Sequence, residues 1–128
     1  MARRLTNLYT GIVEVIEQYR PRAMAVEQLY AHYQHPRTAI LMGHARGVLL
    51  LAAGQRGIPV TSYNATQVKK TITGHGRASK LQMQYAMLRE LGLPTLPEPP
   101  DVADALAAAL CHYHTQKSPA VATGGPVK

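Results

Sequence analysis

Apolar positions recur at three- and four-residue intervals along most of this chain, the spacing of amphipathic helices. The first such stripe comprises Leu5, Leu8, Ile12, Val15, Ile16 and Tyr19. Pro21 ends this predicted helix, and Ser79 is a good N-cap for a later one that Gly92 stops. The pattern also predicts helices over residues 38–55, from residue 65, and over 101–114. Tyr19 and Tyr85 fall on apolar stripes and are predicted to lie in the core.

Two short runs break the helical pattern and predict strands. Residues 23–26 are apolar, follow a turn and lead into Glu27, and residues 60–63 follow Gly57 and Pro59. Open α/β sheets place their chemistry at the carboxyl ends of strands, so Glu27 is a candidate functional residue. A carboxylate directly after a buried strand costs desolvation unless something pairs with it. An ion pair with an arginine is the structural alternative.

The predicted helix over residues 38–55 is apolar nearly all round, which predicts burial on more than one side. Gly43 and Gly47 lie one turn apart on it and cost about 1 kcal/mol each relative to alanine. A close helix contact, either within the chain or at a dimer seam, compensates such a cost. The most apolar stretch, residues 48–53, is far shorter than the roughly 20 residues of a membrane span.

The composition near the C-terminus predicts where the folded domain ends. Residues 93–100 hold four prolines and predict a rigid connector, and residues 118–128 have the composition of a disordered tail. We therefore expect one domain over residues 1–117. Cys111, the single cysteine, excludes an internal disulfide, fits a reducing cytoplasm and is expected to be a small buried hydrophobe.

Charge is unevenly distributed. The net charge of +7 and the pI near 9.9 favour an anionic partner, either nucleic acid or an anionic membrane, with a basic protein that binds neither as the alternative. Residues 28–89 contain no Asp or Glu. The eight basic residues of this stretch are Arg37, Arg46, Arg56, Lys69, Lys70, Arg77, Lys80 and Arg89. Carboxylates border it on both sides.

Those bordering carboxylates suggest metal chemistry. Asp101 and Asp104 are three residues apart and share one face near the start of a predicted helix, where Glu27 could meet them. Mg²⁺ prefers such oxygen ligands, and phosphodiester cleavage is well served by two ions about 4 Å apart. The alternative is that both aspartates simply stabilise the first helical turn, by about 0.5–2 kcal/mol. Zinc is disfavoured, because His112 and His114 point to different faces and no zinc motif is present.

Tyrosine is the only aromatic residue, and Tyr30 lies three residues after Glu27. Its ring could stack on an unpaired base, an interaction worth about 1–3 kcal/mol. Packing against a neighbouring helix is the alternative.

Five motifs, taken in order, resemble a known family. They are Val26-Glu27-Gln28-Leu29-Tyr30, Gly43-His44-Ala45-Arg46-Gly47, Gln67-Val68-Lys69-Lys70-Thr71-Ile72-Thr73-Gly74, Ala78-Ser79-Lys80 and Asp101-Val102-Ala103-Asp104-Ala105-Leu106-Ala107. In sequence and spacing they resemble the RuvC family of Holliday junction resolvases, from the first helix to His114. The resemblance implies an α/β, RNase H-like fold with few strands and four to five helices. It also implies a homodimer that cuts four-way DNA junctions with Mg²⁺, or Mn²⁺ in its place, with no membrane partner and with a branch-migration helicase complex as a further partner.

The resemblance also implies roles for particular residues. Glu27, Asp101 and Asp104 match family metal-binding carboxylates, and Lys69 and Lys80 match lysines near the DNA and the active site. Tyr30 matches an aromatic that contacts bases at the junction centre. Lys70 and Arg77 of the basic stretch extend the expected DNA-binding set. Arg46 lies in a matching motif, with no more than a basic or structural role expected.

One departure from the family pattern bears on activity. Family members begin with a strand that carries an Asp-Pro-Gly type motif, whose aspartate is the central metal ligand, and two more strands follow. Here Met1 falls almost at the first helix, so these elements have no counterpart. We therefore expect an N-terminally truncated fold of low stability and little or no cleavage by the chain as written. A junction-cutting endonuclease and a catalytically inactive junction-binding or dimerisation remnant remain the two functional hypotheses.

Overall fold

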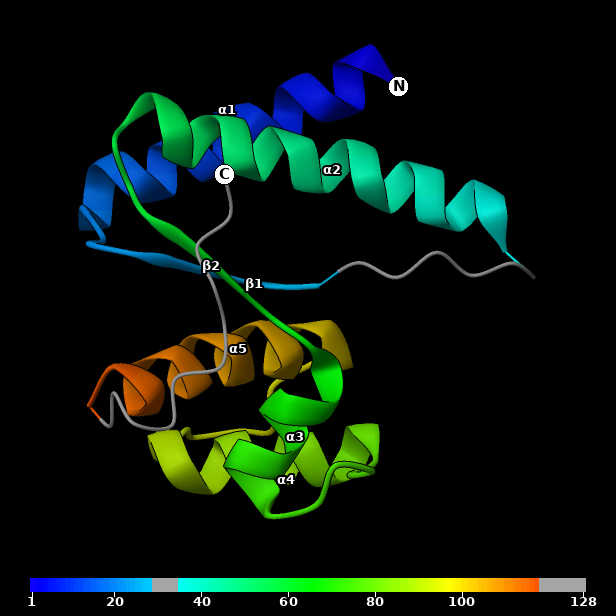
Figure 1. The fold of residues 1–128 in the computed structure, drawn as a ribbon, viewed down its shortest axis with the longest axis vertical. Coiled ribbons are helices and arrows are strands. Elements are labelled where there is room, and N and C mark those ends of the chain that lie inside the picture. Colours follow the sequence, from blue (N-terminus) through cyan, green and yellow to red (C-terminus); the bar gives the residue numbers. More distant parts are fainter. Residues whose placement is uncertain (29–34, 118–128) are drawn as a thin grey trace. The chain divides into compact units, whose positions relative to one another are not determined.

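The computed structural model describes residues 1–28 and 35–117 (Figure 1). The elements in order are α1 (Ala2–Tyr19), β1 (Met24–Glu27), α2 (Pro36–Gln55), β2 (Val60–Tyr63), α3 (Ala65–Thr73), α4 (Lys80–Leu91) and α5 (Pro100–Lys117). Tyr30 and the predicted tail over 118–128 lie outside the described residues. Across the described ranges, no helix combines the length and the apolar character needed to cross a membrane.

The chain forms two compact units, which are described separately. Within the described residues, the first unit comprises residues 1–24 and 35–60, and the second comprises residues 25–28 and 61–117. The first therefore holds α1 and α2, and the second holds α3, α4 and α5. The strands contribute residues to both units.

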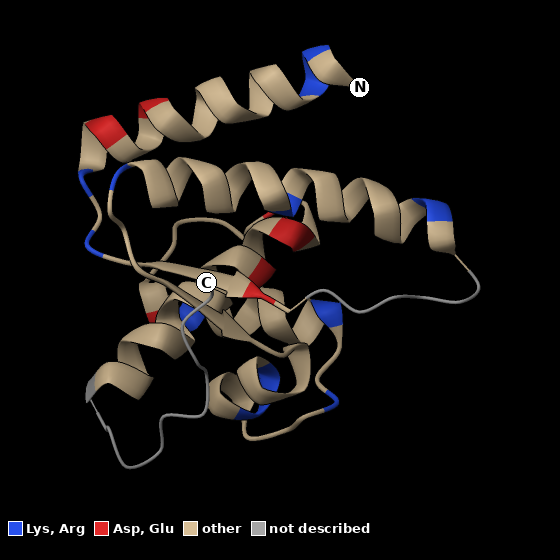
Figure 2. Cartoon of the chain, turned by 45° about the horizontal axis from the view of Figure 1, so that its top comes forward, with Lys and Arg blue, Asp and Glu red and all other residues tan. Residues whose placement is uncertain are grey.

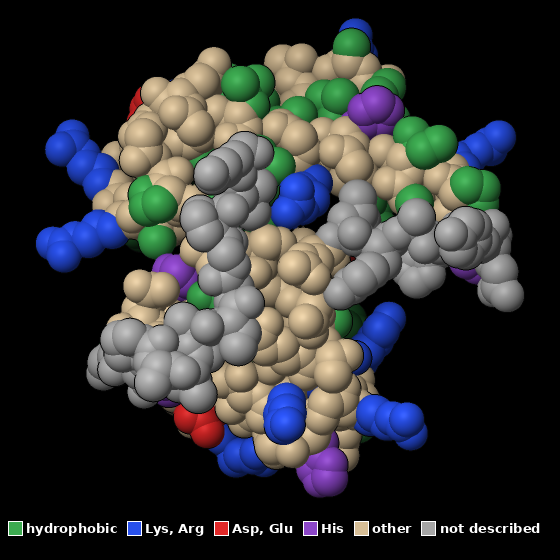
Figure 3. All heavy atoms as spheres, viewed as in Figure 1, with side chains coloured by type: hydrophobic (Ala, Val, Ile, Leu, Met, Phe, Trp, Pro, Cys, Tyr) green, Lys and Arg blue, Asp and Glu red, His purple; other side chains and the backbone are tan. Residues whose placement is uncertain are grey.

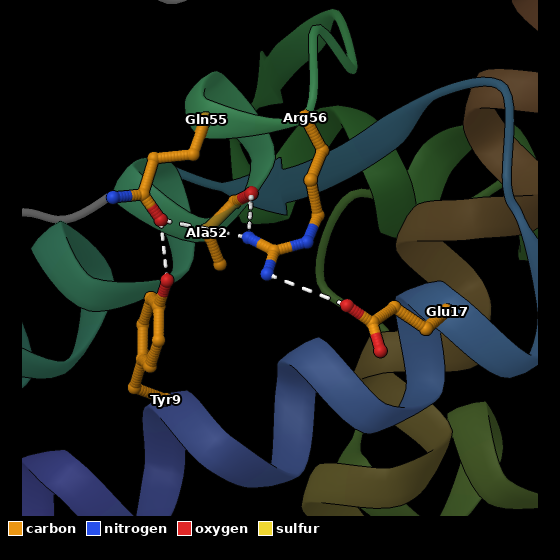
Figure 4. A network of polar contacts seen from close by, with 5 residues as sticks. All are labelled: Tyr9, Glu17, Ala52, Gln55 and Arg56. Atoms are coloured by element: carbon orange, nitrogen blue, oxygen red, sulfur yellow. Dashed lines mark hydrogen bonds and ion pairs between the residues drawn. The ribbon is translucent and has the colours of Figure 1, made fainter.

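In the first unit α1 and α2 pack along each other, joined by a polar network (Figure 4). The Tyr9 hydroxyl donates a hydrogen bond to the side-chain oxygen of Gln55. Arg56 donates to the Ala52 carbonyl at 3.2 Å, and its guanidinium lies 3.7 Å from Glu17. Because the Arg56–Glu17 ion pair is largely in contact with solvent, it contributes at most about 1 kcal/mol.

The predicted burial of α2 on more than one side is wrong for the chain alone. Its exposed apolar side chains are Ile40, Leu41, Met42 and Leu51, and only Ala52 and Ala53 are fully buried. The predicted core position of Tyr19 is also wrong, since 70% of this residue is exposed. A Cβ added at Gly47 meets nothing within 4 Å, so the structure does not bear out a close helix contact there within the chain.

The two strands form a two-stranded sheet. The N–H of Met24 donates to the Pro59 carbonyl at 2.9 Å, and the N–H of Gln28 donates to the Tyr63 carbonyl at 2.7 Å. Both partners advance by four residues, so the strands run parallel and α2 connects them. The second strand lies where the sequence predicted it. The first is shifted by one residue, which makes Glu27 its last residue.

The core of the second unit lies where α3 and α4 pack against α5. Its largest fully buried side chains are Tyr63, Met83, Met87 and Cys111. Small residues Ala103 and Ala107 precede Cys111 at four-residue intervals on α5, and all three belong to this core. The predicted burial of Cys111 is confirmed. The predicted core position of Tyr85 is wrong, because α4 is apolar on two faces and buries the face that carries the methionines.

Local capping fixes where α3 and α4 begin and end. The Asn64 side chain accepts a hydrogen bond from the Gln67 N–H at 2.7 Å, and Gly74 ends α3 in the left-handed conformation with φ 83°. Ser79 and Gln82 form a reciprocal capping box that starts α4 at Lys80. These caps place two candidate lysines, one on α3 and one at the first position of α4, on well-defined helices.

Candidate metal and nucleic-acid site

Three elements of the second unit bring candidate residues to one small hollow. Glu27 from the end of β1, Lys69 from α3 and Asp104 from α5 line it. Val68 and Met83, both buried in the core, also line this hollow. Figure 2 shows the acidic positions at the end of the strand and on the neighbouring helix of this unit. Glu27 and Asp104 are 77 residues apart in the sequence, and the fold places them in one site.

Five of the predicted site residues influence one another electrostatically at this hollow. Burial raises the pKa of Glu27 above its ordinary value, and the negative charges of Asp104 and Asp101 raise it further, whereas Lys69 opposes the shift. Burial likewise raises the pKa of Asp104, with Asp101 adding to the shift and with Lys69 and Lys80 lowering it. The carboxylates are therefore close enough to repel one another, and the two lysines partly relieve that repulsion.

This arrangement suits a divalent cation. Partly desolvated carboxylates that repel each other are costly alone, and a cation between them offsets both the repulsion and the desolvation. Their oxygens are the hard donors that Mg²⁺ and Mn²⁺ prefer. In the described ranges, however, no three His, Cys, Asp or Glu side chains lie close enough together to hold one ion. Glu27 and Asp104 share the hollow, while the exposed Asp101 acts from the first turn of α5.

A purely structural role is the alternative to metal binding for both Glu27 and Asp101. An ion pair with an arginine stays the structural alternative for Glu27, and the positive charge that lowers its pKa is that of Lys69, which lines the same hollow. Asp101 does lie in the first turn of α5, where a carboxylate favours any helix. Its electrostatic influence on the two other carboxylates is compatible with either role.

The remaining basic candidates surround the hollow or lie beyond it. Lys80 is the first residue of α4 and influences Asp104, while Lys70 on α3 and Arg77 in the following loop are exposed. Figure 3 shows basic side chains and a histidine projecting from this unit. The predicted DNA-binding residues that the structure describes are Lys69, Lys70, Arg77 and Lys80, and all of them lie in the second unit. The structure does not describe Tyr30.

Sequence reasoning missed the contact between Tyr63 and His112. The Tyr63 hydroxyl lies 2.6 Å from Nδ1 of His112, and the two rings meet edge to face with centroids 5.7 Å apart. This contact joins the end of β2 to the helix that carries Asp101 and Asp104. The available signal was a tyrosine at the end of an apolar strand, because a buried phenol needs a polar partner.

Comparison with protein families gives one consistent result. The family model described as "Crossover junction endodeoxyribonuclease RuvC" matches residues 1–112. A protein of that name from Rhodopirellula baltica is 50% identical over 119 residues, covering 93% of this chain and 67% of the relative. Another, from Desulforamulus reducens, is 49% identical over 109 residues, covering 85% of this chain and 66% of the relative. The chain thus spans about two thirds of the length of these curated relatives.

Similar solved structures belong to the same family as these relatives. The Thermus thermophilus RuvC structure matches with a TM-score of 0.82 and 34% identity, over 98% of this chain and 71% of that one. T. thermophilus RuvC in complex with a Holliday junction substrate matches with a TM-score of 0.87 and 35% identity, over 98% and 73%. The predicted α/β, RNase H-like fold and the suspected family are both confirmed. This chain belongs to the RuvC family of crossover junction endodeoxyribonucleases.

Proposed function

We propose that this protein is a metal-dependent endonuclease that cuts four-way DNA junctions. The observation that carries the proposal is the hollow in which Glu27 and Asp104 repel each other beside Lys69. Family membership supports it, since the curated relatives are named crossover junction endodeoxyribonucleases and a related RuvC binds a Holliday junction substrate.

Glu27 and Asp104, with Asp101 beside them, would hold Mg²⁺ or Mn²⁺. When bound, such an ion supplies charge stabilisation at the phosphate and activation of water. The chain's own groups set the conditions for this chemistry. Burial and mutual repulsion favour the protonated carboxyls, whereas Lys69 favours the ionised form of both hollow-lining acids and Lys80 favours it for Asp104. The lysines thus oppose the rise in the pKa of these acids and favour their ionised, metal-binding form.

Lys69 and Lys80 have a second proposed role, toward DNA. Ammonium groups beside the carboxylates attract the phosphate to be cut and stabilise the charge that develops on it. Lys70 and Arg77, both exposed on the same unit, extend the basic surface along the DNA backbone. Tyr30, proposed to contact bases at the junction centre, lies outside the described residues.

We also propose how this protein assembles and where in the cell it acts. Four-way junctions present two opposed strands to be cut, which suits a homodimer with two equivalent sites. We propose that the exposed apolar side chains of α2 form the interface between the two copies. A branch-migration helicase complex is the proposed further partner. Because the proposed substrate is chromosomal DNA and the one thiol fits a reducing compartment, we propose that the protein acts in the cytoplasm.

Junction binding and cleavage by the chain test this function separately. Labelled four-way junctions and linear duplexes of equal sequence are titrated without metal, and Mg²⁺ is then added to score cutting. Preference for the junction, with Mg²⁺-dependent cutting that Glu27→Gln and Asp104→Asn abolish without loss of binding, supports the nuclease. Binding without cutting supports the junction-binding alternative. Equal affinity for junction and linear duplex contradicts both.

A further inference from the structure

A second surface feature of the same unit lies between α3 and α4. It is a groove of about 500 Å³ whose lining includes Ile72, His75, Ser79, Leu81, Tyr85 and Arg89. Pockets of this volume accommodate ligands of small-molecule size. None of these residues lines the carboxylate hollow, so the groove is a separate feature.

The apolar part of the groove is exposed although the core beneath it is complete. Leu81 and Tyr85 lie one turn apart on α4 and are 55% and 48% exposed. The opposite face of the same helix buries Met83 and Met87 almost completely. The exposed pair therefore contributes little to the core of the unit, and an aromatic ring beside an aliphatic side chain forms a surface on which a flat apolar group can lie.

The walls of the groove are fixed by internal hydrogen bonds. The N–H of His75 donates to the Thr73 hydroxyl at 3.1 Å, and that hydroxyl donates to the Lys69 carbonyl at 2.7 Å. On the other side the Ser79 N–H donates to the Gln82 side chain at 2.7 Å. A ligand therefore meets a surface whose backbone is already ordered, which reduces the entropy lost on binding.

Charge indicates what kind of ligand fits. Arg89 and His75 belong to the lining, which contains no Asp or Glu. Lys80, which influences the carboxylate site, directly follows Ser79 of the groove. We propose that the groove binds an unpaired nucleotide of the DNA strand held at Lys80, with its base against Tyr85 and a phosphate at Arg89. The inference rests on the proposed function and adds a positioning site to it.

A nucleotide fits this surface better than an acidic protein segment. Aromatic side chains flanked by cations are the usual platform for bases of single strands, and the stacking is tolerant of sequence. The groove also adjoins the lysine proposed to meet the cleaved phosphate, so one strand can reach both. An acidic segment has no such reason to bind beside the carboxylate hollow.

A single fluorescent reporter tests the occupant directly. The chain contains no tryptophan, so Tyr85→Trp introduces the only one. Four-way junction DNA, a single-stranded oligonucleotide and a poly-glutamate peptide are titrated into this variant without metal. We expect both DNAs to quench the tryptophan and the peptide to leave it unchanged. Unchanged emission on a bound junction overturns the inference, as does quenching by the peptide alone.

Matched substitutions give a second measurement. Tyr85→Ala is expected to weaken junction binding by about 5- to 150-fold, the range measured for loss of base stacking, while Tyr85→Phe stays within about twofold because it keeps the ring. Tyr113→Ala, which removes a tyrosine of 52% exposure on α5, is the control for surface loss. Equal affinities of wild type and Tyr85→Ala overturn the groove assignment alone. A wild-type chain that binds no DNA overturns the proposed function together with it.

Discussion

The Tyr63 hydroxyl and the Nδ1 atom of His112 lie 2.6 Å apart, which ties the end of β2 to α5. Tyr63 is almost fully buried, and burial raises its pKa, so the phenol stays neutral and hydrogen-bonded under ordinary conditions. Because α5 also carries Asp101 and Asp104, this contact helps to fix the helix that presents the proposed metal ligands to the end of β1.

Tyr63→Phe keeps the buried ring and removes the hydroxyl. We expect the free energy of unfolding to fall by about 0.5–1.5 kcal/mol, the usual worth of one hydrogen bond, as measured by urea denaturation. Tyr19→Phe is the matched control, because 70% of Tyr19 is exposed on α1. Equal losses in the two variants would show that the contact with His112 contributes nothing specific.

The proposed metal ligands should destabilise the metal-free fold at neutral pH. Folding raises the pKa of Glu27 and Asp104 above their ordinary values of 4.5 and 3.8. Each therefore favours the fold below its ordinary pKa, and that contribution is lost as pH rises through the higher folded pKa. Glu27→Gln and Asp104→Asn should thus raise Tm by a few degrees at pH 7.5 and by less toward pH 4. A gain that is constant across this range contradicts the repulsion.

Mg²⁺ is expected to reverse the ranking of the wild type and these variants by Tm. An ion that binds the folded chain stabilises it by mass action, so millimolar Mg²⁺ is expected to raise the Tm of the wild type and to leave the Glu27→Gln, Asp104→Asn double variant unchanged. Ca²⁺ titration provides a comparison with a larger oxygen-bound cation. Equal Tm shifts in wild type and double variant would assign the ion to another part of the chain.

Lys69→Met is predicted to act on DNA and on the acids together. Losing one phosphate contact should weaken junction binding and reduce the log–log salt slope by about 1. Removing the ammonium group also raises the pKa of Glu27 and Asp104 further, so Mg²⁺ binding should shift to higher pH. Arg4→Gln, an exposed charge loss on α1, controls for net charge. An unchanged pH profile of Mg²⁺ binding contradicts the coupling.

The sequence predicted those features of the fold that depend only on residues within one helix or strand. Ser79 as N-cap, Gly92 as helix end and residues 60–63 as a strand were all predicted, because caps, turns and apolar runs act over a few residues. Likewise Glu27 ends β1 as its position after an apolar run indicated. The position of Glu27 at a strand end suggested that it could meet Asp104, and the family resemblance made that expectation specific, since spacing alone does not bring together residues of different elements.

Sequence signals failed where two faces of one helix are equally apolar. On α4 the choice between Tyr85 and Met87 for the core depends on the shape of α5, whose Ala103 and Ala107 leave room for flexible methionines. On α2 the apolar circumference predicted burial that the described chain does not supply. Periodicity reports which side chains are apolar, and only the neighbours of a helix decide which of them are covered.

The role of Gly47 can be resolved by one pair of substitutions. Gly47 lies inside α2 with open space around its missing Cβ, whereas Gly74 ends α3 at φ 83°. Gly47→Ala should therefore stabilise the dilute protein by about 1 kcal/mol, and Gly74→Ala should destabilise it by about 1 kcal/mol. Melts at rising protein concentration add the test of assembly. If α2 is the seam between two copies, the gain from Gly47→Ala disappears as the wild type dimerises, because the added methyl group then meets the partner helix. A gain independent of concentration places the seam elsewhere.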